Sequence, residues 1–170
     1  IYPDEGSIGV LGGSALQAKD RIGYLPEERG VYRKMKVLPF LTYMARLKGV
    51  DPGAARTKAA QWLAKVGLGD VGRKKCEELS KGMQQKVQFA SALIHEPELV
   101  ILDEPWSGLD PINADVLREV VHELRDAGKT VLFSTHQMEQ AEKICEQICI
   151  IARGRKVLDG GLAAIKRAAA

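Results

Sequence analysis

The chain has 170 residues, 45% of them hydrophobic and 28% charged, with a formal net charge of +3. This composition is typical of a globular domain and excludes a disordered tail, a collagen-like fibre and a small disulfide-stapled protein. Its three cysteines include no C-x-x-C pair, and no run of 18 apolar residues occurs, so neither a zinc site nor a membrane-spanning helix is indicated.

The N-terminal part of the chain predicts short strands followed by a helix. Its first twenty residues are rich in turn formers, which indicates a hairpin or a strand with loops. Residues 22–25 predict a short strand that ends at Pro26, and residues 27–36 predict a charged loop. Apolar residues at helical spacing over 38–47 predict a helix.

Two further helices are predicted in the middle of the chain. Asp51 and Pro52 mark a helix start, with an acidic N-cap followed by proline at the first helical position, and Gly67 ends that helix. The next helix opens at Ser80 and closes before Pro97.

The remaining residues alternate between strands and helices, as in a parallel sheet. In chain order the expected elements are a strand at 99–102, a helix marked by 116–124, a strand at 130–134, a helix at 138–145, a hairpin of 148–151 with 156–158, and a tail. The whole pattern predicts an α/β fold with an all-helical insert. We divide the chain into four parts, namely 1–32, 33–95, 96–159 and 160–170.

Two adjacent carboxylates follow the buried strand at 99–102. Asp103 and Glu104 are expected at the carboxyl edge of the sheet, which is where open α/β sheets bind ligands. One carboxylate can hold Mg²⁺ and the other can take a proton from water. The alternative for this pattern alone is a strand end with solvated acids.

Two other segments suggest phosphate binding. Ser80 and Gly82 open a helix, where small residues and free backbone N–H groups favour an anion. His136 follows the strand at 130–134 and would lie at the same sheet edge as Glu104, where it can donate a hydrogen bond to a phosphate. Taken singly, an ordinary N-cap serine and a surface histidine are the alternatives.

The order and spacing of these segments resemble the nucleotide-binding domain of ABC transporters. Residues 79–85 resemble the signature motif, 99–104 the Walker B strand, 107–110 the D-loop and 24–28 the Q-loop, and His136 resembles the switch histidine. The likeness is strongest to bacterial sodium-extrusion-type exporter ATP-binding proteins. It implies a P-loop NTPase-like, RecA-like core with an all-helical signature subdomain.

The resemblance also implies catalytic roles. Glu104 would polarise the attacking water, Asp103 would support Mg²⁺ and His136 would contact the terminal phosphate of ATP. ATP and Mg²⁺ are therefore the expected cofactors. The Q-loop position holds Glu27 where the family has glutamine, and a carboxylate there can still bind Mg²⁺ or the nucleotide.

Signature residues are implied to reach the nucleotide of a second domain. The expected contacts are Ser80, Lys81, Gly82 and Gln84, and Asp110 of the D-loop would communicate across the dimer. Lys81 stands where the family usually has glycine, which adds a positive charge beside the phosphate.

The phosphate loop of the family, Walker A, is missing from these 170 residues. The pattern G-x-x-x-x-G-K-[ST] occurs nowhere, and Gly128-Lys129-Thr130 lies between a helix and a strand, the reverse of a P-loop. In the family, Walker A lies just upstream of a segment like 1–6. We therefore expect an N-terminally truncated core, and a chain that is inactive with ATP on its own.

By resemblance, the expected partners are a transmembrane permease subunit and a second ATPase domain in a head-to-tail dimer. We expect the protein to be peripheral, at the cytoplasmic face of the membrane. Its ATP hydrolysis would drive transport through the permease, and export is the favoured direction. No nucleic-acid partner is expected, because the net charge is weak. The alternatives are a non-transport ABC ATPase and a non-catalytic remnant that binds a partner.

Overall fold

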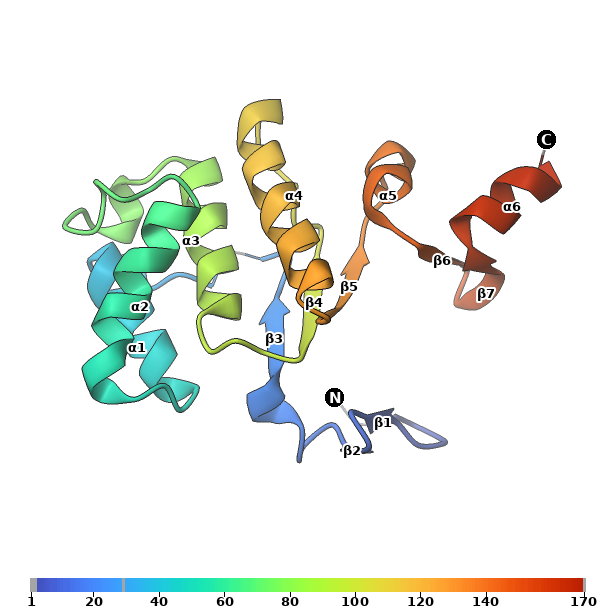
Figure 1. Cartoon of the computed structure of the whole chain (residues 1–170), viewed down its shortest axis with the longest axis horizontal. Coiled ribbons are helices and arrows are strands. Elements are labelled where there is room, and N and C mark those ends of the chain that lie inside the picture. The colour runs from blue at the N-terminus through green and yellow to red at the C-terminus, as the bar shows by residue number, and fades with distance from the viewer. Residues whose placement is uncertain (1–2, 29, 170) are drawn as a thin grey trace. The chain divides into compact units, whose positions relative to one another are not determined.

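The computed structural model describes residues 3–28 and 30–169 and forms two compact units, Ile1–Ser134 and Thr135–Ala170. In the first unit the elements are β1 (Gly9–Val10), β2 (Gly13–Ser14), η1 (Lys19–Arg21), β3 (Ile22–Leu25), α1 (Val37–Leu47), α2 (Pro52–Lys65), η2 (Cys76–Glu78), α3 (Lys81–Leu93), β4 (Leu99–Asp103), α4 (Pro111–Asp126) and β5 (Thr130–Ser134) (Figure 1). In the second they are α5 (Met138–Ile144), β6 (Gln147–Ala152), β7 (Arg155–Gly161) and α6 (Leu162–Ala169). The boundary after Ser134 falls inside the predicted segment 96–159, so the four-part division remains a prediction.

The first unit is built on a parallel sheet of β3, β4 and β5, with β4 in the middle. Leu25 pairs with Leu102, which pairs in turn with Phe133, so the three strands end at one edge. The chain crosses from β3 to β4 through α1, α2 and α3, and from β4 to β5 through α4. The predicted strands are confirmed, and β4 runs one residue further, to Asp103.

The two faces of this sheet differ. Leu25, Val100 and Leu102 are fully buried on the face that α3 and α4 cover, and Figure 1 shows both helices beside the strands. On the other face Tyr24 is 55% exposed and Leu132 is 59% exposed. Parallel sheets normally carry helices on both faces. Within the described residues, this sheet therefore keeps an apolar face open to solvent.

Three helices begin with a side-chain N-cap. Asp51, Ser80 and Asp110 each accept a hydrogen bond from the backbone N–H three residues later, at 3.0, 3.2 and 3.0 Å. The predicted starts of α2 and α3 are confirmed. The helix that residues 116–124 mark is confirmed as α4, which begins earlier, at Pro111, with Asp110 as its N-cap. This is the same Asp-Pro signal that marks the start of α2.

The second unit holds the predicted hairpin. β6 and β7 pair antiparallel from Gln147↔Gly161 to Ala152↔Arg155, with an irregularity between Ile150 and Ile151. α6 follows β7 directly, so the predicted tail is helical. In the part of the chain that the structure describes, no helix combines the length and the hydrophobicity needed to cross a bilayer.

Candidate functional site

The two predicted catalytic carboxylates lie where β4 ends. Asp103 is the last residue of β4, and the hydroxyl of Ser134 at the end of β5 donates a hydrogen bond to its Oδ1. Glu104 leaves the sheet with φ of +45° and donates its backbone N–H to the carbonyl oxygen of Ser134 at 3.2 Å. This left-handed conformation is uncommon for a residue with a side chain, and such backbone strain is concentrated at functional sites.

The start of α3 packs against the turn that follows these carboxylates. A Cβ atom added to Gly82 would lie 3.3 Å from Leu109 Cδ2 and 3.6 Å from the carbonyl oxygen of Gly108. Ser80 and Lys81 are exposed at the same helix start, and Ser80 Oγ accepts the N–H of Met83. The structure therefore brings Gly82, two residues after Ser80, against the turn before Asp110.

Gln84 faces the protein rather than solvent. Its Nε2 donates to the carbonyl oxygens of Cys76 at 3.0 Å and Leu79 at 3.1 Å, which fixes the turn before α3. Both of these bonds use its amide nitrogen within the fold. Its contact with a nucleotide stays a prediction.

Sequence reasoning missed the buried polar residues of α3, three of which have long side chains. Gln85, Lys86 and Gln88 are only 2%, 4% and 5% exposed. Gln85 Nε2 donates to the carbonyl oxygen of Pro105, directly after Glu104, at 3.2 Å. The signal that could have found them is the interleaving of polar and apolar residues along this helix, which places polar side chains among buried ones. A buried polar side chain needs a hydrogen-bond partner, so each of them points to a contact with another segment.

Lys86 of α3 and Asp110, which precedes α4, are two charged side chains that attract each other. Burial lowers the pKa of Lys86, and attraction to Asp110 partly offsets that effect. Hydrogen bonds from the backbone N–H and then the side chain of Asn113 hold the pKa of Asp110 below its usual value, so the carboxylate stays ionised. The end of the 107–110 turn therefore carries a fixed negative charge at the N-terminus of α4, where the helix dipole also favours it.

Glu27 is exposed in the loop after β3. Gln88 holds this loop through three hydrogen bonds with the backbone of Pro26, Glu28 and Gly30. The loop of Glu27 and the turn after Glu104 are thus both bonded to α3.

His136 belongs to the second compact unit, on the segment that leads into α5. It is exposed, and beside it the Thr135 hydroxyl accepts the N–H of Gln137 at 3.1 Å. The placement of His136 beside Glu104 stays a prediction.

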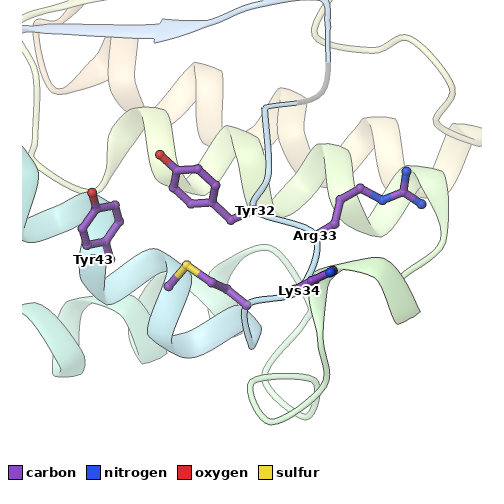
Figure 2. Close-up of a pocket in the computed structure, with 5 residues that line it drawn as sticks. Tyr32, Arg33, Lys34 and Tyr43 are labelled. Carbon is purple, nitrogen blue, oxygen red and sulfur yellow. The ribbon is translucent and has the colours of Figure 1, made fainter.

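A hollow of about 490 Å³ opens between α1 and the loop that leads to it. Its lining comprises Tyr32, Arg33, Lys34, Met35 and Tyr43. The rings of Tyr32 and Tyr43 have centroids 6.0 Å apart, and Figure 2 shows them beside each other with Arg33 extending away from them. A second hollow of about 500 Å³ shares Tyr43 and continues along Arg46 and Leu47. The surface is aromatic and apolar, with positive charges around it.

Comparison with known proteins decides the family. The sequence model of the family described as ABC transporter matches residues 1–107. The chain belongs to this ABC transporter family. It is 51% identical over 164 residues to the uncharacterized ABC transporter ATP-binding protein YhaQ of Bacillus subtilis (strain 168), covering 96% of this chain and 55% of YhaQ. It is 35% identical over 163 residues to Nod factor export ATP-binding protein I of Burkholderia orbicola (strain AU 1054), covering 94% and 54% of the two chains.

A solved structure described as the ATP binding subunit of an ABC transporter has the same fold. Its TM-score is 0.87 at 29% identity, and the match covers 99% of this chain and 72% of that one. The predicted P-loop NTPase-like ABC fold is confirmed. The chain spans a little over half the length of the two curated ABC relatives described above.

The residues at the end of β4 suit the cofactors that the ABC family uses. Mg²⁺ is usually held by one or two carboxylates together with phosphate oxygens and water. Among the described residues no group of three or more His, Cys, Asp or Glu could hold a metal by itself. The carboxylate of Asp103, oriented by the Ser134 hydroxyl, fits a Mg²⁺ ion that arrives with a nucleotide.

Proposed function

We propose that this chain is part of the ATP-hydrolysing subunit of an ABC transporter that works as an exporter. The observation that carries the proposal is the meeting of three motifs at one edge of the sheet. Asp103 ends β4, Glu104 follows it, and the turn after them packs against Gly82 at the start of α3. The relative named for Nod factor export favours the direction of transport.

The proposed chemistry is phosphoryl transfer from ATP to water. Glu104 takes the proton of the attacking water, Asp103 and Glu27 bind Mg²⁺, and His136 donates to the terminal phosphate. Bound Mg²⁺ would neutralise charge on the phosphate oxygens as the bond to the leaving phosphate breaks. The protein contributes mainly by positioning these groups and excluding bulk water.

The nucleotide contacts across a dimer are part of the same proposal. Ser80, Lys81, Gly82 and Gln84 would face the ATP held by a second ATPase domain, in a head-to-tail pair. The exposed N-terminus of α3 suits an anion because its backbone N–H groups and Lys81 are both positive. Asp110 would transmit the nucleotide state of one ATP site to the second ATP site of the dimer.

The transmembrane partner is proposed to dock on the hollows beside α1. Tyr32, Tyr43 and Leu47 are 52%, 42% and 59% exposed there, and Arg33 and Lys34 add positive charge. An apolar side chain from a partner helix would fill such a hollow, and acidic residues beside it would pair with the basic rim. The subunit would then sit at the cytoplasmic face of the membrane without crossing it.

The test of the proposed function is Glu104→Gln in the whole-length subunit. Steady-state ATP turnover should fall by about 10²–10⁴ because the general base is lost, while ATP affinity stays within about twofold. Glu119→Gln, at an exposed position of α4, serves as the matched control. An unchanged turnover in Glu104→Gln would contradict the assignment of the base.

A second candidate applies to the 170 residues taken by themselves. They contain no G-x-x-x-x-G-K-[ST] loop, which favours a partner-binding role without catalysis. We propose that the purified chain does not hydrolyse ATP, because the cradle for the β- and γ-phosphates is absent from this sequence. MgATP turnover above the level of a Glu104→Gln chain would refute this.

A further inference from the structure

A buried glutamine joins the loop that carries Glu27 to the helix that begins at Ser80. Gln88 is 5% exposed and lies near the middle of α3. Its Nε2 donates to the carbonyl oxygens of Glu28 at 2.9 Å and Pro26 at 3.3 Å, and its Oε1 accepts the N–H of Gly30 at 3.2 Å. One side chain therefore pairs with three backbone groups of a single loop.

Only a glutamine side chain satisfies this arrangement. It supplies two donors and an acceptor from one planar amide, whereas a glutamate supplies acceptors alone. An asparagine is one methylene shorter, and a methionine of similar size offers no donor. Loss of the amide would leave loop carbonyls near the protein interior without their partner, which buried polar groups rarely tolerate.

The helix connects this contact with the predicted phosphate-binding end. Eight residues separate Gln88 from Ser80, which is about 12 Å of helix at 1.5 Å per residue. Helices are stiff over such a length, so a displacement of the loop is carried to the N-terminus of α3. Gln85, one turn closer to Ser80, is bonded to Pro105 and keeps the same helix in register with the turn after Glu104.

We propose that Gln88 is a positioning residue, which fixes the loop of Glu27 to α3 and carries movement of that loop to Ser80 and Gly82. A transmembrane partner docked beside Tyr32, a few residues after Gly30, would act on the same loop. The consequence for turnover rests on the proposed function, whereas the link between loop and helix does not. Gln88 touches no reacting atom in this proposal and acts through the loop and the helix.

The link is tested by amide hydrogen exchange on the whole 170-residue chain. In Gln88→Met, exchange at Gly30 should speed up at least tenfold, while amides in β4 and α1 keep their rates. Gln88→Glu retains the acceptor for Gly30 and loses both donors, so Gly30 should keep most of its protection. Gln61→Met, at an exposed position of α2, is the matched control and should change neither.

Two results would overturn the link. One is an unchanged rate at Gly30 in Gln88→Met. The other is acceleration of every core amide in step with Gly30, since Gln88 would then only stabilise the fold. Gln88→Glu keeps the volume of the side chain and decides the link if the methionine variant does not fold, because a tenfold faster exchange at Gly30 in this variant would contradict the acceptor role of the Gln88 side-chain oxygen.

The transmission is tested in the whole-length subunit assembled with its membrane partner. Gln88→Met should lower the ratio of partner-stimulated to basal ATP turnover by at least about threefold, with the KM for ATP within twofold. An unchanged ratio would overturn the transmission. Absence of any ATP turnover in the unmutated complex would instead refute the proposed function, and the exchange rate at Gly30 would still decide the link.

Discussion

At the scale of single residues, one side chain can serve the fold and the site at once. Ser80 caps α3 by accepting the N–H of Met83, and the same exposed hydroxyl is proposed to meet a phosphate. A capping role depends only on an acceptor oxygen, whereas a phosphate contact also depends on charge. Substitutions can therefore separate the two roles.

We predict that Ser80→Asp keeps the stability of the fold and loses ATP-dependent dimerisation. Aspartate caps a helix as well as serine, so the free energy of unfolding should stay within about 0.5 kcal/mol, whereas Ser80→Ala should lose about 1 kcal/mol. The added negative charge should weaken dimerisation at least about tenfold, because like charges a few ångströms apart repel strongly. Urea unfolding measures the stability, and sedimentation of the whole-length subunit with ATP in a Glu104→Gln background measures dimerisation. Undiminished dimerisation of Ser80→Asp would argue against the phosphate contact.

We predict that the folded protein loses stability in mild acid because His95 is buried. Burial lowers the pKa of His95, and this effect outweighs the hydrogen bond between its Nε2 and the carbonyl oxygen of Ile22 at 3.1 Å. Its Nδ1 is buried without a hydrogen-bond partner, so protonation would place an unpaired N–H in the interior. Since the folded pKa is the lower one, stability should be greatest above the ordinary value of about 6.5 and fall as the pH drops below it.

The measurement is the midpoint of urea unfolding at pH 7.5 and at pH 5.5. His95→Gln should unfold at a midpoint that changes less between the two pH values, because glutamine does not titrate. Equal changes in both proteins would show that burial of His95 does not control this pH dependence.

At the scale of elements, the packing of α3 on β3 depends on a glycine. A Cβ atom on Gly23 would lie 2.3 Å from the carbonyl oxygen of Ala92 and 2.9 Å from Pro97 Cγ. The first of these atoms is backbone and cannot rotate away. The last turn of α3 thus approaches β3 as closely as a residue without a side chain allows.

We predict that Gly23→Ala destabilises the fold by about 2–3 kcal/mol, because the helix must move away from the strand. Gly9→Ala is the control, since a Cβ there would meet its nearest neighbour only at 4.0 Å. Guanidinium unfolding of both variants gives the comparison. A Gly23→Ala protein as stable as Gly9→Ala would mean that the helix shifts without cost.

At the scale of the whole molecule, the main feature of the Ile1–Ser134 unit is a parallel sheet with helices on one face. Tyr24 and Leu132 stand in register with Ile101 between them, and both are more than half exposed. A contiguous apolar face of this kind promotes association. The relatives, of which this chain covers about half, carry further residues that could cover it.

We predict that the 170-residue chain self-associates through this face at high concentration. Tyr24→Ser together with Leu132→Ser should lower the average mass in sedimentation velocity toward that of the monomer, because less apolar surface is available for burial. Ile112→Ser removes an apolar side chain that is 77% exposed on α4 and should leave the mass unchanged. Equal masses for the double variant and the unmutated chain would contradict the prediction.

Much of the fold could be predicted because its signals are local. The apolar run of β4, the Asp-Pro start of α2 and the serine cap of α3 each lie within a few residues, and the structure has all three. Asp110 and Pro111 carry the same Asp-Pro signal at the start of α4, which lies before the apolar residues that mark this helix. The predicted position of Asp103 at the end of a strand also followed from the local pattern.

The sequence by itself determined the order of the elements, because capping and periodicity act between near neighbours, and it indicated the family through motifs that each lie within a few residues. The roles of the candidate catalytic side chains stay predictions. Only the tertiary structure decided that Gly82 packs on the Gly108–Leu109 turn and that Gln88 holds the loop of Glu27. These contacts join residues 26 to 62 positions apart, at distances set by the packing of α3 on the sheet. A local sequence pattern does not predict which distant backbone group a buried side-chain amide will bond. The partner depends on the positions of all the elements packed around that amide.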